Sequence, residues 1–194
     1  MPMLNNPQPE RLPVVSVIGD ARLEEPGAIS QAQQLGAALM EAGFRIVTGG
    51  LGGVMEAVSR GARQAPGWRD GRIIGILPSY LASDASPWCD IVIPTGMQLA
   101  RNVLVVASGD VVLAFGGGSG TLSEIAIAWQ LGRPIVALGN RGWSSRLAGE
   151  AIDGRSAAPI YAARDIDDAV AQCRVLVTRP NLGGDIGSGW RRGQ

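Results

Sequence analysis

The sequence contains neither lysine nor histidine, and all 17 of its basic residues are arginine. Without lysine, the chain has no amine to form a Schiff base with pyridoxal phosphate and no Walker-type lysine to contact a triphosphate. Without histidine, it has no Ser-His-Asp triad, no Cys-His pair and no histidine-rich metal site. Two large classes of catalytic chemistry are therefore excluded.

Cysteine is scarce as well. Cys89 and Cys173 stand far apart in the sequence, so we predict neither a metal site nor a disulfide framework. A reducing, cytoplasmic compartment fits this usage. The polar, proline-rich start lacks the apolar core of a signal peptide, and no later segment reaches the ~18 unbroken apolar residues of a membrane span. The 17 acidic residues balance the 17 basic ones, so we expect partners other than nucleic acid or a membrane, namely a small molecule or a second copy.

Short apolar runs alternate along the chain with segments of helical spacing. Residues 14–18 form the first apolar run, and apolar residues recur at helical spacing within 28–42. The alternation continues at 44–48, 54–62, 72–77, 90–94, 97–108, 111–115, 121–131, 134–138, 160–161 and 165–176. Strands that are apolar throughout indicate a parallel sheet covered on both sides. The sequence therefore predicts an α/β fold: a Rossmann-like, doubly wound sheet of about seven mainly parallel strands flanked by helices.

The domain organisation is expected to be simple. A chain of 194 residues is long enough for one core, which we place at 13–178. Residues 1–12 and the glycine-rich tail at 179–194 lack periodicity, and we expect both to be flexible. The loop at 78–90 is too long for a simple turn and is expected to border a pocket.

Three loops that contain glycine follow predicted strands. They are Gly19-Asp20, the GGLGG segment at 49–53 and the GGGSG segment at 116–120. Ligands of α/β sheets bind at the carboxyl ends of strands, where loops meet the N-termini of helices. Glycine lets the backbone approach a ligand closely, and the free amides of a helix N-terminus suit a phosphate. We therefore predict a nucleotide phosphate at residues 118–121.

A structural alternative stands beside this prediction. Thr121 and Glu124 have the spacing of a capping box, in which each side chain bonds the backbone amide of the other residue. Four glycines in five residues are unnecessary for a cap, however, and they carry an entropic cost. The G-x-G-x-x-G spacing after the first strand is missing, which disfavours a dehydrogenase.

Two segments, TGGLGGVMEAVSRGA at 48–62 and GGGSGTLSE at 116–124, resemble motifs of the Lonely Guy family in order and spacing. The family carries GGG-x-x-G-L-M-x-x-V-A and, later, P-G-G-x-G-T-x-x-E. Its arginine at the start of the preceding helix matches Arg101. The resemblance covers roughly residues 13–140. The sequence Ala-Arg-Asn at 100–102 is most similar to a branch that includes molybdenum cofactor carrier proteins.

The resemblance implies a nucleotide-binding protein that cleaves the N-glycosidic bond of nucleoside 5'-monophosphates without a required cofactor, and it does not imply a lysine decarboxylase. Glu124 would stabilise the charge on the ribose or activate water, and Arg101 would fix Glu124 or a substrate oxygen. The residues expected to bind phosphate and nucleotide are Gly19, Asp20, Gly49, Gly50, Gly52, Gly53, Gly117, Gly118, Ser119, Gly120 and Thr121.

The resemblance leaves a second function open, in which the same loops hold molybdenum cofactor or a related phosphorylated ligand without chemistry. Glu124 and Arg101 would then have only structural roles, as a cap or an ion pair. Three positions depart from the motifs of the wider family, namely Asn102 for lysine, Gly116 for proline and Asp20 for serine. A homodimer or a higher oligomer is also expected, because the resemblance implies a dimer and because the helix at 121–131, with Trp129, is more apolar than one buried stripe requires.

Overall fold

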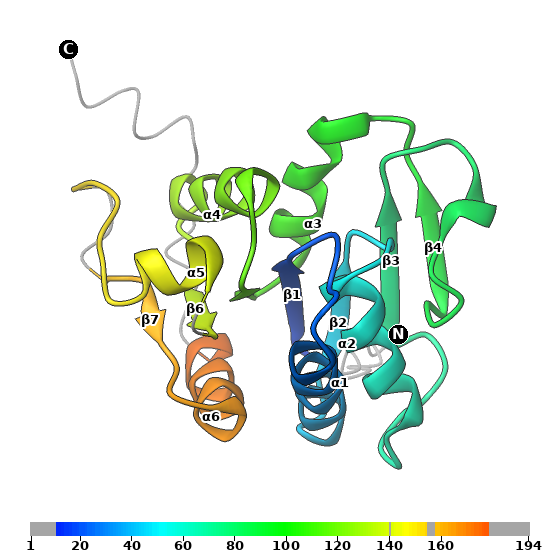
Figure 1. Cartoon of the computed structure of the whole chain (residues 1–194), viewed down its shortest axis with the longest axis horizontal. Helices are drawn as coiled ribbons and strands as arrows, with labels where there is room; N and C mark the ends of the chain where they lie inside the picture. The colour runs from blue at the N-terminus through cyan, green and yellow to red at the C-terminus, as the bar shows by residue number, and fades with distance from the viewer. Residues whose placement is uncertain (1–10, 140, 155–157, 179–194) are drawn as a thin grey trace, which may run out of the picture.

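The computed structural model describes residues 11–139, 141–154 and 158–178. Within these ranges, seven strands form one parallel sheet in the order β4-β3-β2-β1-β5-β6-β7 (Figure 1). The strands are β1 (Val14–Gly19), β2 (Arg45–Thr48), β3 (Ile73–Leu77), β4 (Ile91–Pro94), β5 (Val111–Phe115), β6 (Ile135–Leu138) and β7 (Tyr161–Ala162). The predicted α/β, Rossmann-like sheet is confirmed. Except for residues 11 and 12, the two ends expected to be flexible lie outside the described residues.

Helices cover both sides of the sheet. They are α1 (Pro26–Glu41), α2 (Val54–Gln64), α3 (Asn102–Ser108), α4 (Ser119–Gln130), α5 (Gly142–Leu147) and α6 (Ile166–Val177), with short 3-10 helices η1 (Ala82–Asp84) and η2 (Gln98–Arg101). One apolar core lies under α1, α2 and α6, and a second lies under α3, α4 and α5. None of the helices in the described ranges is long and apolar enough to cross a lipid bilayer.

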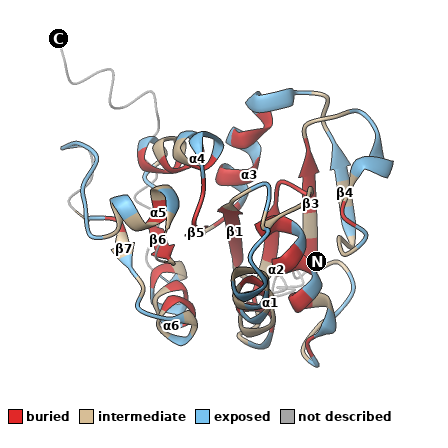
Figure 2. Cartoon of the chain, viewed as in Figure 1, coloured by how far each residue is buried: buried red, intermediate tan, exposed pale blue. Residues whose placement is uncertain are grey.

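Burial on both sides explains why the central strands are almost entirely apolar. Every residue of β5 is buried, and β1 is buried from Val14 to Ile18, because helices pack on both of their sides (Figure 2). The edge strand β4 is different. Ile91 and Ile93 are each 43% exposed, which leaves apolar surface at this edge of the sheet.

The structure differs from the sequence-based predictions at several points. The segment predicted as one helix at 97–108 divides into η2 and α3. The six-residue helix α5 was not predicted, because so short a segment has too few turns to establish a period. Trp129 is 5% exposed and donates its indole N–H to Asp153 Oδ1 at 2.8 Å, so this side chain of α4 packs inside the chain and does not support a dimer surface.

Candidate functional site

The loops after β1, β2 and β5 meet at the carboxyl ends of the strands. β1 lies between β2 and β5, where the strand order reverses and α/β proteins bind ligands. The Val54 amide donates to the Asp20 carbonyl at 2.8 Å, which joins the first two loops. A Cβ atom on Gly19 would lie 2.5 Å from the Phe115 carbonyl oxygen and 2.8 Å from Val54 Cγ2. The structure thus brings the three glycine-containing loops together.

The N-terminus of α4 has no side-chain cap. Gly118 is the N-cap residue, and the first helical bond runs from the Leu122 amide to the Gly118 carbonyl at 3.0 Å. The amides of Ser119, Gly120 and Thr121 therefore have no acceptor within the helix. The positive end of the helix dipole lies at the same place. This combination suits a phosphate oxygen.

The predicted capping box is wrong. Thr121 is the third residue of α4, and the amides that a capping side chain at this position would bond are already inside the helix. Its side chain is 3% exposed and packs against the glycine loop, where a Cβ on Gly117 would lie 2.5 Å from the Thr121 hydroxyl. Glu124 is directed toward Arg101 rather than toward the start of the helix.

The glycines at 116–120 divide into two kinds. Gly116 and Gly117 have φ values of 66° and 102°, in the left-handed region that favours glycine. Gly118 and Gly120 are exposed, and a Cβ atom on either would have nothing within 4 Å. The chain's own packing does not require these two glycines, so their backbone faces space that a ligand can fill.

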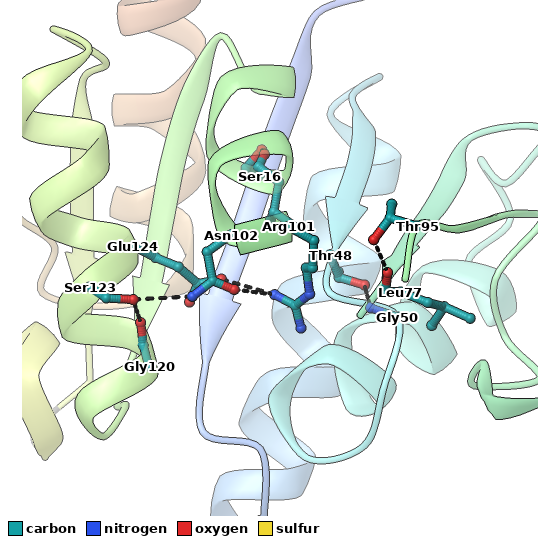
Figure 3. A network of polar contacts seen from close by, with 11 residues as sticks. Ser16, Thr48, Gly50, Leu77, Thr95, Arg101, Asn102, Gly120, Ser123 and Glu124 are labelled. Carbon is teal, nitrogen blue, oxygen red and sulfur yellow. Dashed lines mark hydrogen bonds and ion pairs between the residues drawn. The ribbon is translucent and has the colours of Figure 1, made fainter. Parts of the chain in front are cut away.

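Arg101 forms the centre of a buried polar network between α4 and the loop after β2 (Figure 3). Its Nη1 lies 2.7 Å from Asn102 Oδ1 and 3.4 Å from Glu124 Oε1 (Figure 3). The Asn102 amide donates to Ser123 Oγ at 3.1 Å, and Ser123 Oγ donates to the Gly120 carbonyl at 2.7 Å. The two predicted catalytic residues are therefore in contact, and Asn102 links them to the first turn of α4.

The Arg101 guanidinium also lies against the loop after β2. A Cβ atom on Gly49 would lie 2.8 Å from Arg101 Cζ and 2.7 Å from Met55 Sδ, so no larger residue fits there without displacement. A Cβ on Gly52 would meet its nearest atom only at 3.6 Å. Gly49 is thus the residue of this loop that accommodates Arg101.

Gly50 and Gly53 shape the same loop. Both have positive φ values, 71° and 66°. The Gly50 amide donates to Thr48 Oγ1 at 3.1 Å, and Gly53 is the N-cap residue of α2. These glycines serve the turn between β2 and α2, which carries Gly49 to Arg101.

Burial shifts both members of the ion pair toward neutrality. Desolvation raises the pKa of Glu124 to about 7, although the Arg101 charge opposes this change. Desolvation lowers the pKa of Arg101, against the effect of Glu124. Arg101 Nε is buried without a hydrogen-bond partner among the described residues. The pair combines a carboxyl group that can exchange a proton near neutral pH with a guanidinium that retains donor capacity.

Asp20 lies beside the glycine loop, and a cation faces it. Asp20 Oδ2 is 3.9 Å from Arg141 Nε, and both atoms approach Gly116, where a Cβ would lie 2.5 Å and 3.6 Å from them. Arg141 Nη1 also pairs with Glu25 Oε2 at 3.2 Å. No sequence pattern identifies Arg141, because no motif surrounds it and its neighbours in space come from loops that are distant in sequence.

The family model of the SLOG cluster4 family matches residues 12–170. An uncharacterized protein of Archaeoglobus fulgidus is 39% identical over 130 residues, which is 66% of this chain and 81% of that protein.

Two solved structures are also similar. The molybdenum cofactor binding protein of Rippkaea orientalis has a TM-score of 0.75 and 35% identity, covering 87% of this chain and 99% of its own. The molybdenum cofactor carrier protein of Chlamydomonas reinhardtii has a TM-score of 0.69 and 28% identity, covering 87% of this chain and 100% of its own. These findings confirm the predicted resemblance, and the chain belongs to the SLOG cluster4 family.

Proposed function

We propose that the chain binds a phosphorylated small molecule at the N-terminus of α4 and acts as a carrier for molybdenum cofactor or a close relative of it. The observation that carries this proposal is the free space beside Gly118 and Gly120, at a helix start that no side chain caps. Free amides and the helix dipole would hold the phosphate, and the small residues would let it approach closely.

The comparisons favour a carrier over an enzyme. The two solved structures named above are of a molybdenum cofactor binding protein and a molybdenum cofactor carrier protein, and each aligns with 87% of this chain. A carrier needs a site that binds and releases its ligand intact. The buried contact between Arg101 and Glu124 suits this role, since it joins η2 to α4.

The test of the carrier function is stoichiometric binding. The purified full chain is incubated with isolated molybdenum cofactor, and bound cofactor is counted per chain after gel filtration. We expect about one cofactor per chain if one α4 N-terminus binds one phosphate, together with slower loss of the cofactor on exposure to air. Absence of both retention and protection would contradict the carrier function.

A second candidate is the hydrolysis of nucleoside 5'-monophosphates, and one observation favours it. Glu124, whose pKa is raised to about 7 by burial, lies in the first turns of the helix that would bind the 5'-phosphate. Cleavage of the N-glycosidic bond develops positive charge on the ribose. A carboxylate can stabilise that charge and take a proton from water.

Release of the free base from a panel of nucleoside 5'-monophosphates tests this candidate. We expect Glu124→Gln to abolish release, because the amide neither carries negative charge nor accepts the proton. Retention of phosphate binding in this variant would separate catalysis from binding. Equal release by Glu124→Gln and the wild-type chain would rule out Glu124 as the catalytic group.

The chain is further proposed to form a homodimer through the edge of the sheet at β4, the helix η2 and the exposed side of α3. Figure 2 shows exposed segments in all three elements. The large exposed apolar residues on or next to these elements are Ile91, Ile93, Met97, Leu99, Val103 and Leu104. Between Asp90 and Asp110 the sequence has one charged residue, Arg101, and it is buried. A surface without charge fits a second copy of itself better than a charged partner.

Light scattering of two matched variants tests the dimer. Leu99 is 80% exposed in η2, and Val175 is 56% exposed in α6, away from this surface. We expect Leu99→Asp to shift a dimer to monomer, whereas Val175→Asp leaves it unchanged. A wild-type chain that is monomeric at micromolar concentration would contradict the proposal.

A further inference from the structure

Arg141 lies in the loop between β6 and α5. Hydrogen bonds join the start of α5 to the glycine loop at 116–120. The Trp143 and Ser144 amides donate to the Gly117 and Gly116 carbonyls, each at 3.0 Å, and the Gly116 amide donates to Ser144 Oγ at 2.8 Å. The backbone of Arg141 therefore lies beside the loop that leads into α4. Its guanidinium approaches Gly116, two residues before the N-cap of that helix.

The contacts of Arg141 leave much of its hydrogen-bonding capacity unused. Its Nε is 3.9 Å from Asp20 Oδ2, which is beyond hydrogen-bond length. Its Nη1 pairs with Glu25, whose side chain is 76% exposed, and such a surface pair contributes little to stability. Its Nη2 is buried and has no partner among the described residues. A buried donor without an acceptor is unfavourable, so an incoming anionic oxygen would improve its environment.

The negative charge of Asp20 also supports a role for Arg141 in phosphate binding. A carboxylate beside a bound phosphate would repel it unless a cation offsets the repulsion. Arg141 is placed to do this, because it faces Asp20 across Gly116. A planar guanidinium can also bond two oxygens of one phosphate.

We propose that Arg141 is an anion-binding residue of this site. It exchanges its weak contacts with Asp20 and Glu25 for the phosphate of the ligand at the N-terminus of α4. This inference rests on the proposed phosphate site and extends it, because it adds a charged side chain to the backbone amides. It also specifies the ligand: the group bound between Gly116 and the start of α4 is an oxyanion rather than a neutral sugar or ring.

The test is isothermal titration of the full chain with adenosine 5'-monophosphate and with inorganic phosphate. We expect Arg141→Gln to weaken the binding of both about tenfold, the effect of losing one charge-assisted hydrogen bond. The matched control is Arg133→Gln. Arg133 lies just before the amino end of β6, whereas the site lies at the carboxyl ends of the strands. It donates to the Ala107 carbonyl, so its loss removes the same charge far from the site. We expect this control to change affinity less than about twofold, as a distant, screened charge should.

The background variant Asp20→Asn separates direct binding from simple neutralisation of Asp20. If Arg141 contacts the phosphate, adding Arg141→Gln to Asp20→Asn still weakens binding about tenfold. If the weakening disappears in this background, Arg141 acts only by offsetting Asp20, and the inference is wrong.

The remaining outcomes distinguish this inference from the proposed function. A wild-type chain that binds adenosine 5'-monophosphate, with Arg141→Gln and Arg133→Gln binding equally well, overturns the inference alone. A wild-type chain that binds neither probe overturns both the inference and the phosphate site. Thermal unfolding of each variant confirms that the comparison is made between folded proteins.

Discussion

Replacing Gly120 by alanine separates a glycine kept for a ligand from a glycine kept for the fold. Gly120 is the second residue of α4, and a Cβ atom there would have nothing within 4 Å. Alanine is the better helix former, so we expect the free energy of unfolding to rise by roughly 0.5–1 kcal/mol. The same methyl group would occupy the space in which the phosphate is proposed to lie.

The expected effect on binding is opposite and larger. Displacing the phosphate from one backbone amide removes a charge-assisted hydrogen bond, worth about 1.5–3 kcal/mol, which corresponds to roughly 10- to 100-fold weaker binding. Urea unfolding measures the stability, and titration with adenosine 5'-monophosphate or isolated molybdenum cofactor measures the affinity. Gly120→Ala should therefore gain stability and lose affinity.

Gly27→Ala is the matched control. Gly27 is the second residue of α1, a Cβ atom there also has nothing within 4 Å, and α1 packs on the other side of the sheet from α4. It should gain stability similarly while its affinity stays unchanged. If Gly120→Ala binds both ligands as tightly as Gly27→Ala does, Gly120 does not face the phosphate.

Two further variants test the network around Arg101. Gly49→Ala should displace the Arg101 guanidinium and lower the free energy of unfolding by about 1–3 kcal/mol, while Gly52→Ala, which has room, stays within about 0.5 kcal/mol; urea unfolding measures both, and equal losses would contradict the contact. Because burial raises the pKa of Glu124 from 4.5 to about 7, the folded state holds this proton more tightly than the unfolded state does. The stability of the wild-type chain relative to Glu124→Gln should therefore fall as pH rises from 4.5 to 7, and parallel pH profiles would contradict it.

The order of strands and helices could be predicted because a strand buried on both sides of a parallel sheet is a continuous run of apolar residues. β5, the VVLAF segment, is buried at every position, and so it contrasts clearly with the loops around it. The start of α4 could not be placed as well. Thr121 and Glu124 match a capping box by spacing alone, and the helix begins earlier, where Gly118 enters it without a side chain.

The site was predictable only in part, because its contacts join loops that are distant in sequence. The pairing of Arg101 with Glu124 could be anticipated from adjoining helices, and it is present at 3.4 Å. The contact between Gly49 and Arg101 could not, since it depends on how closely the turn after β2 approaches η2. Arg141 is not part of any recognisable motif. It lies beside Asp20 because the loops after β1, β5 and β6 are neighbours in the fold.

The glycine excess that marked this site in the sequence has several physical causes, and only one of them concerns a ligand. Gly116 and Gly117 adopt left-handed backbone angles, and Gly49 makes room for a guanidinium. These residues would be needed even if the chain bound nothing. Gly118 and Gly120 meet neither demand, because ordinary space surrounds them and no positive φ requires them. Gly118 and Gly120, which the fold does not require to be glycine, are therefore the residues that most directly support the proposed phosphate site.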